Sequence, residues 1–114
     1  MVEIDRKNEA GTEVLTIRGE VDASSSIDLD QAIGNCVREG ATRLLVDCTG
    51  LDYISSAGLG VFISYVEEFR EKGVRLVMFG LNSRVSHTFS LLGLADLMEI
   101  TPDRESANRK LNEA

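Results

Sequence analysis

Apolar and polar residues alternate over the first part of the chain. The segments "VEID" and "EVLTIRGEV" both have the two-residue period of strands that bury one face. Between them, "KNEAG" is rich in turn-forming residues, so we predict a hairpin with strands over residues 2–6 and 13–19. The period then lengthens to three or four residues, which predicts an amphipathic helix with Leu29, Ala32, Ile33, Cys36 and Val37 on one face.

Capping residues predict where two of the helices begin and end. Ser25 and Asp28 resemble a capping box at the start of this first helix, and Gly40 follows its last periodic residue. At the far end of the chain, Thr101 is the predicted N-cap and Pro102 the first residue of a polar helix. Only Ala107 and Leu111 would tie that last helix to the core.

The middle of the chain continues the alternation of strands and helices. Residues 42–50, "TRLLVDCTG", lack a polar face and predict a buried central strand. A helix from Ala57 to Lys72 follows, ended by Gly73, and then a strand over 74–80, a short helix over 83–93 and a strand over 97–100. The long helix would turn one apolar face inward, formed by Leu59, Phe62, Ile63, Val66 and Phe69. The order ββαβαβαβα predicts one α/β domain over residues 1–114, with a mixed sheet of about five strands and about four helices packed mainly on one face.

Composition and charge narrow the classes of function. The formal net charge of −7 disfavours nucleic acid and anionic membrane surfaces as partners. No apolar run is long enough to cross a bilayer, and the N-terminus has no apolar block typical of a signal peptide, so we expect a cytoplasmic protein. Cys36 and Cys48 lack metal-site spacing and are interpreted as core residues, and His87 is the single histidine. We therefore expect no metal and no cofactor.

The segment "ISSAGLG", residues 54–60, is the least ordinary part of the sequence. Ser55 or Ser56 is the expected N-cap of the long helix. Gly58 and Gly60 each cost about 1 kcal/mol relative to alanine within a helix. Two missing side chains in one turn leave bare backbone, which allows close approach either of the domain's own sheet or of a partner.

This turn allows three chemical interpretations. A nucleophilic serine is disfavoured, because G-x-S-x-G is absent and His87 is the only candidate base. A phosphate-cradling loop is disfavoured, because the Walker lysine and the third glycine of a dinucleotide fingerprint are missing. A phosphorylation site fits better, since free N–H groups at a helix N-terminus tolerate the added charge of about −1.5 to −2. The pattern therefore favours a binding switch over an enzyme.

Three segments together resemble the anti-sigma factor antagonist family of STAS domains: "GEVDASSS", "VDCTGLDYISSAGLGVF" and "GVRLVMFGLNSRVSHTFSLLGL". The resemblance covers roughly residues 10–100. Its most specific motif is D-x-[ST]-x-[LV]-x-x-[IM]-x-S-[SAT]-G-[LM], matched by Asp47, Thr49, Leu51, Ile54, Ser56, Gly58 and Leu59. It implies a partner switch. The unphosphorylated protein binds an anti-sigma factor that is also a serine kinase of the GHKL type, phosphorylation releases it, and a PP2C-type phosphatase restores it.

Carried over to this chain, the resemblance makes Ser56 the phosphoacceptor. Many family members have aspartate directly before the phosphoserine. This chain has Ser55 there, a second hydroxyl, which makes Ser55 a minor alternative acceptor. The implied partner surface comprises Asp22, Ser24, Ser55, Ser56, Ala57, Gly58, Leu59 and Gly60. Asp22 is expected beside Ser56 and to serve binding rather than loop structure. The protein would be a monomer or weak dimer, and the alternative function is a STAS-domain subunit of an ABC-type lipid transport complex with a structural role.

Overall fold

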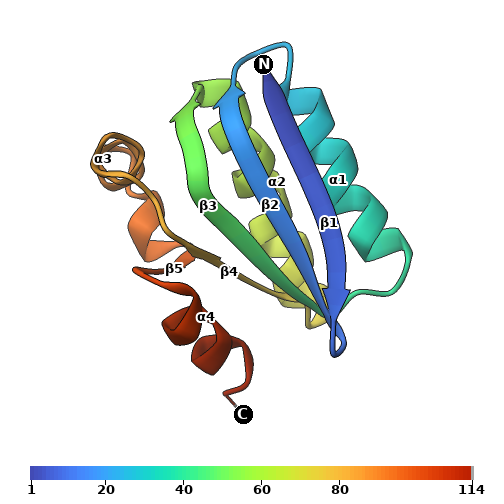
Figure 1. The fold of residues 1–114 in the computed structure, drawn as a ribbon. Helices are drawn as coiled ribbons and strands as arrows, with labels where there is room; N and C mark the ends of the chain where they lie inside the picture. The colour runs from blue at the N-terminus through green and yellow to red at the C-terminus, as the bar shows by residue number, and fades with distance from the viewer. Residues whose placement is uncertain (114) are drawn as a thin grey trace.

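A five-stranded mixed sheet forms the centre of the molecule, with strand order β1-β2-β3-β4-β5 (Figure 1). The computed structural model describes residues 1–113. The strands are β1 (Val2–Glu9), β2 (Thr12–Val21), β3 (Arg43–Ile54), β4 (Arg75–Phe79) and β5 (Glu99–Thr101). The helices are α1 (Ser26–Arg38), α2 (Ser56–Lys72), α3 (Ser83–Leu91) and α4 (Arg104–Leu111), with a 3₁₀ turn at Leu94–Asp96.

The first two strands form the predicted hairpin. They pair antiparallel from Val2 opposite Gly19 to Glu9 opposite Thr12. Only Ala10 and Gly11 connect them, and both have positive φ, at 53° and 90°. Such a two-residue loop matches the right-handed twist of the strands. The hairpin pairing therefore begins at Val2 and Gly19, as predicted, and continues closer to the turn than the predicted 2–6 and 13–19. The remaining strand pairs are parallel.

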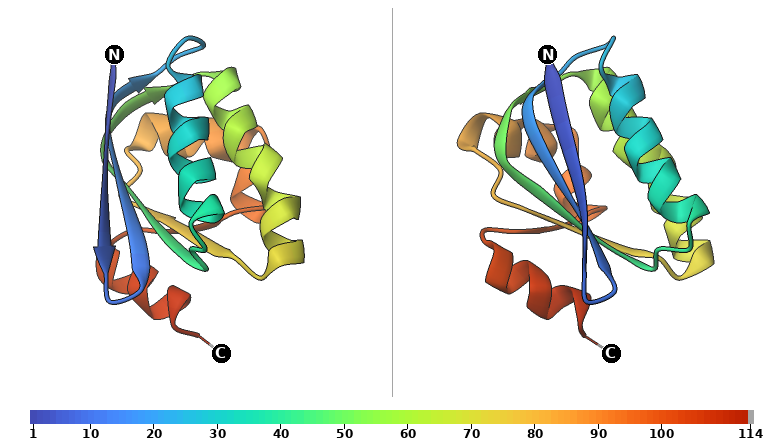
Figure 2. Two further views of the ribbon diagram at one scale, coloured as in Figure 1. Left: turned by 90° about the vertical axis from the view of Figure 1, so that its right-hand side faces the viewer. Right: turned by 45° about the vertical axis from the view of Figure 1, so that its right-hand side comes forward.

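Helices cover the two faces of the sheet unequally, as predicted. The helices α1 and α2 lie side by side on one face, and α4 lies on the other (Figure 2). The main core includes Leu15 and Ile17 of β2 together with Val85 and Phe89 of α3. A smaller core under α4 joins Val14, Leu45, Val77, Phe79, Ala107 and Leu111. The predicted α/β fold is confirmed.

Both cysteines lie in the interior. Cys36 of α1 and Cys48 of β3 are fully buried free thiols. Burial raises the pKa of each thiol, so both stay protonated and unreactive near neutral pH. Their interpretation as small core residues is confirmed.

One predicted helix cap is correct only in position, and another is wrong. Ser25 does precede α1, but its φ and ψ of −87° and −7° are already helical and its side chain makes no capping bond. Thr101 pairs with Phe79 in β5, so its backbone still belongs to the sheet and Pro102 comes before the helix begins. Asp103 caps α4 instead, accepting from the amide of Ser106 at 2.8 Å.

Some element bounds and one inward position also differ. The strand β3 continues past Gly50 to Ile54, because β2 also extends to Val21 and keeps pairing with it. The last strand is Glu99–Thr101 rather than 97–100, since the 3₁₀ turn precedes it. Ile63, predicted to face inward, is 44% exposed. The end of α2 is as predicted, with Gly73 at φ 71°.

The attachment of α4 gives a stability prediction. Leu111 is 4% exposed in the smaller core, while the preceding Lys110 is exposed. Leu111→Ala should lower the free energy of unfolding by about 2 to 3 kcal/mol, since the chain end can partly close the cavity. Urea denaturation measures it, and Lys110→Ala is the control, expected within about 0.5 kcal/mol of the parent. Equal effects of the two substitutions would contradict this packing of α4.

Candidate functional site

The start of α2 is fixed by Ser55. Its hydroxyl accepts a hydrogen bond from the amide of Gly58 at 3.2 Å, as an N-cap does. Its own amide donates to the carbonyl of Val21, at the end of β2, at 2.8 Å. Of the two serines predicted as caps, Ser55 therefore takes the role. Ser56 is left as the first helical residue.

Ser56 presents an exposed hydroxyl at the N-terminus of a 17-residue helix. No residue among 1–113 forms a hydrogen bond with that hydroxyl. The first turn of α2 contains no acidic side chain, so the positive end of the helix dipole is not neutralised from within the helix. An anionic group on Ser56 would be stabilised there without displacing an existing contact.

Asp22 holds together the loop between β2 and α1. One carboxylate oxygen, Oδ1, accepts from the amide of Ser25 at 2.8 Å, from the hydroxyl of Ser24 at 2.8 Å and from the hydroxyl of Ser25 at 3.0 Å. These bonds, the Ser25 amide first, lower the pKa of Asp22 to about 2. The expectation that Asp22 has no part in loop structure is therefore wrong. Its contact with a partner stays a prediction.

The two predicted segments of the site meet at Val21. The Val21 carbonyl receives the Ser55 amide, so Asp22 and Ser56 each lie one residue from this hydrogen bond. The side chain of Val21 is fully buried against the first turn of α2. Parallel pairing of β2 with β3 as far as Ile54 aligns the two strand ends. The fold thus brings residues 22–24 and 55–60 to one edge of the sheet.

The two glycines have different surroundings. A Cβ atom at Gly58 would lie 2.7 Å from Cγ1 of Ile54 and 2.8 Å from Cγ1 of Val21. At Gly60, a Cβ atom would have no neighbour within 4 Å. Gly58 is therefore required by the domain's own packing, while Gly60 leaves open backbone on the surface. Leu59, at 2% exposed, belongs to the core, and Ala57 is exposed.

Two exposed isoleucines extend the site beyond the predicted residues. Ile63 follows Ser56 and Gly60 on the same face of α2, at helical spacing. Ile27, 62% exposed, lies in the first turn of the neighbouring α1, directly after the serine-rich loop. Large exposed apolar side chains beside a polar edge are typical of protein interfaces. The sequence could have indicated that Ile27 is exposed, because this residue lies outside the apolar stripe of α1.

The unbonded hydroxyl of Ser56 is the distinctive chemical group at this edge. His87 lies exposed on α3 and makes no hydrogen bond to Ser56. Among residues 1–113, no three side chains of His, Cys, Asp or Glu are grouped closely enough to hold a metal ion. Over the same residues, no helix is long and apolar enough to cross a bilayer.

Comparison with known proteins places this geometry in a family. The STAS domain model matches residues 3–107. Over 85 residues the chain is 36% identical to the anti-sigma-B factor antagonist of Listeria monocytogenes, covering 74% of each chain. The chain belongs to the anti-sigma factor antagonist family of STAS domains, as the motif around Ser56 predicted.

Solved structures share the fold. An anti-sigma factor antagonist from Mycobacterium paratuberculosis superposes with a TM-score of 0.84 at 24% identity, over 99% of this chain and 96% of that one. The phosphorylated form of the Bacillus cell fate determinant SpoIIAA superposes with a TM-score of 0.71 at 19% identity, over 95% and 99%.

The glycine surroundings predict opposite effects of one substitution. Gly58→Ala should lower the free energy of unfolding by about 1 to 3 kcal/mol, because the new methyl group would overlap the Cγ1 atoms of Val21 and Ile54. Gly60→Ala should be neutral or stabilise by up to about 1 kcal/mol, since alanine favours the helix and meets nothing. Urea unfolding of both variants measures the difference. A loss of stability in Gly60→Ala equal to that in Gly58→Ala would contradict these positions.

The Asp22 loop predicts a pH dependence. The pKa of Asp22 in the fold, about 2, lies below its ordinary value of 3.8, so its charged form stabilises the fold above about pH 4 and that contribution fades as the pH falls toward 2. Asp22→Asn should therefore melt below the parent at pH 7, and the gap should close between pH 4 and pH 2. Thermal unfolding followed by circular dichroism across this range measures the gap.

The matched control is Asp52→Asn, because the Asp52 carboxylate is exposed on β3 and makes no hydrogen bond within residues 1–113. It should show no such gap. A difference between Asp22→Asn and the parent that stays constant from pH 7 to pH 2 would refute the role of the Asp22 charge.

Proposed function

We propose that this protein is the phosphorylatable antagonist in a partner switch. Unphosphorylated, it binds an anti-sigma factor that is also a serine kinase of the GHKL type. Transfer of a phosphoryl group to Ser56 releases it, and a PP2C-type phosphatase restores the binding form. The observation that carries this proposal is the exposed hydroxyl of Ser56 at the first position of α2, within the family motif.

The chain's part in the transfer is to present its acceptor. The Ser56 oxygen forms the new bond to the γ-phosphorus of ATP as the bond to ADP breaks, and the hydroxyl proton leaves to a base. Both ATP and the base belong to the kinase. The rigid cap at Ser55 and the buried Leu59 hold the acceptor in one place, which favours a single productive geometry.

Ser55 is the poorer acceptor on physical grounds. Its hydroxyl already accepts from the Gly58 amide, and its own amide is bound to Val21. A phosphate on Ser55 would have to replace the cap at the junction of β2 and α2. The hydroxyl of Ser56 does not cap the helix, so it can be modified without loss of the cap.

Release follows from charge rather than from refolding. A phosphate adds about −1.5 to −2 charge beside the Asp22 loop, where the helix N-terminus stabilises it within the fold. The phosphate would compete with the Asp22 carboxylate for a basic group of the kinase that pairs with this edge. Its hydration shell would also separate the partner from the apolar side chains of Ile27 and Ile63. Relatives support this reading, since one protein of this fold is described in a phosphorylated form.

The first arm of the test locates the phosphate. The purified chain is incubated with its cognate kinase and ATP, and the site is mapped by mass spectrometry. We expect phosphate on Ser56 in the parent and in Ser55→Ala, and none in Ser56→Ala. Phosphate on Ser55 alone, or on the Ser24–Ser26 cluster, would overturn the assignment.

The second arm separates binding from folding. Calorimetry should show that Ser56→Ala keeps its affinity for the anti-sigma factor, while Ser56→Asp binds at least about tenfold more weakly, because of the added charge. Both variants should melt close to the parent, since Ser56 is not the cap. Equal affinities would contradict a charge switch. Co-purification with a transporter ATPase, without phosphate on Ser56, would instead favour the lipid transport alternative.

A further inference from the structure

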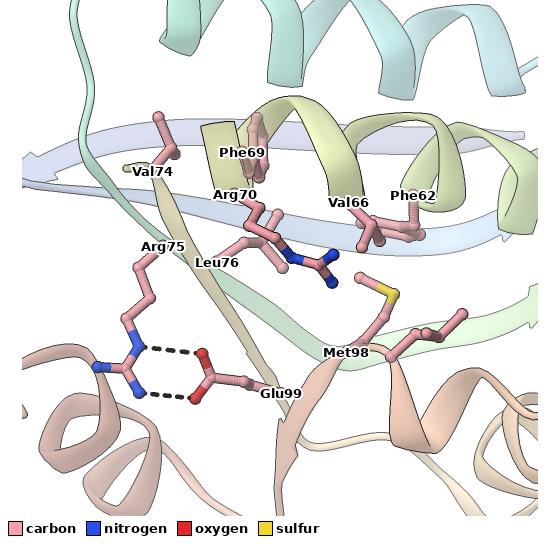
Figure 3. A pocket seen from close by; sticks show the side chains of 10 residues that line it. Phe62, Val66, Phe69, Arg70, Val74, Arg75, Leu76, Met98 and Glu99 are labelled. Carbon is pink, nitrogen blue, oxygen red and sulfur yellow. Dashed lines mark hydrogen bonds and ion pairs between the residues drawn. The ribbon is translucent and has the colours of Figure 1, made fainter. Parts of the chain in front are cut away.

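A cleft of about 170 Å³ lies under the second half of α2, away from Ser56 (Figure 3). It is bounded by α2, β4 and the segment that enters β5. Its apolar lining comes from all three and includes Phe62, Val66, Phe69, Leu76, Leu97 and Met98, with Val74 in the connection between α2 and β4. Leu97 remains 54% exposed, so apolar surface at the rim is still in contact with water.

Two arginines and one glutamate supply the charges of the cleft. Arg75 is engaged by Glu99 through two parallel hydrogen bonds, of 3.0 Å from Nε and 2.8 Å from Nη2 (Figure 3). Glu113 adds a second carboxylate at 3.6 Å from Arg75. The two carboxylates already compensate the charge of Arg75, so it attracts a further anion less than an unpaired arginine would.

Of the two arginines that line the cleft, Arg70 is the one without a partner among the described residues, and its side chain is exposed at the rim. Its guanidinium reaches from α2 across the cleft toward Met98 (Figure 3). Within residues 1–113 it takes part in no hydrogen bond and no ion pair, although the chain carries 19 acidic residues against 12 basic ones. An unpaired guanidinium over an apolar hollow is complementary to an anion that carries apolar bulk.

We propose that this cleft binds a small apolar carboxylate, with its ring or short alkyl chain on the apolar lining and its carboxylate on Arg70. The size of the cleft sets the scale, because an apolar cavity of about 150 Å³ is known to take up benzene. This site is distinct from the partner surface at the N-terminus of α2 and does not depend on phosphorylation of Ser56.

The test uses the purified unphosphorylated chain with its methionine and leucine methyl groups labelled for NMR. Phenylacetate is titrated in, with phenylacetamide as the neutral analogue and 2-phenylethylamine as the cationic one. We expect saturable shifts of the Met98 and Leu76 methyl signals with phenylacetate. Binding should be about tenfold weaker for the amide, which loses the charge-assisted hydrogen bonds, and weaker still for the amine.

Two matched variants test the role of Arg70. Arg70→Gln should weaken phenylacetate binding about tenfold, while Arg84→Gln, which removes an exposed arginine of α3, should leave it unchanged. Both should keep the circular dichroism spectrum of the parent. The proposal is overturned if phenylacetate causes no saturable shift at Met98 and Leu76, if the amide binds equally well, or if the two arginine variants behave alike. It is also overturned if these signals move only when the anti-sigma factor is added.

Discussion

The hydrogen bond from the Ser55 amide to the Val21 carbonyl joins the end of β2 to the start of α2. It exists because β2 and β3 pair in parallel to their last residues, so that both chains leave the sheet at the same edge. Everything proposed for the site depends on that alignment: the Asp22 loop continues from Val21, and Ser56 follows Ser55. The missing side chain of Gly58 is part of the same junction, because the Val21 and Ile54 side chains fill the space where a Cβ would lie.

At this junction, neighbouring residues of the same type have different roles. Ser55 caps the helix and Gly58 allows it to pack, so these two are bound to structural tasks. Ser56 and Gly60 lie on the outer face and carry none. A rigid frame with free positions between its fixed ones suits a charge switch, because a modification can change the surface without altering the stability of the fold.

How far the sequence could predict the structure depended on whether a residue's role was local. The strand periods, the hairpin turn and the Gly73 stop were predictable, since each is decided by a few neighbouring residues. The cap at Ser25 was not, because the Asp22 carboxylate competes for its amide and hydroxyl. Thr101 failed as a cap for a similar reason, as its pairing with Phe79 in β5 keeps its backbone extended.

Contacts between distant segments limited the prediction of burial and of the sites. Val14 is buried by α4, which follows it by some ninety residues, so the alternation of β2 gave no sign of a second covered face. The motif located Ser56 because its spacing is local, but it could not choose the cap between two neighbouring serines. The hydrogen bond from the Ser55 amide to the distant Val21 carbonyl fixes Ser55 at the cap position. The cleft at Arg70 gave no sequence signal, since α2, β4 and the start of β5 meet there only in the fold.

The two proposed anion sites both lie on α2, one at its N-terminus at Ser56 and the other at the Arg70 guanidinium in its last turn, where the helix dipole itself is negative. The helix between them is fixed by Leu59, Phe62 and Phe69 in the main core and has no glycine after Gly60 until its C-cap. Coupling between two sites requires an element with two arrangements. A helix held this firmly offers a single arrangement, so an anion at one end should leave affinity at the other unchanged, and the two sites are best understood as independent.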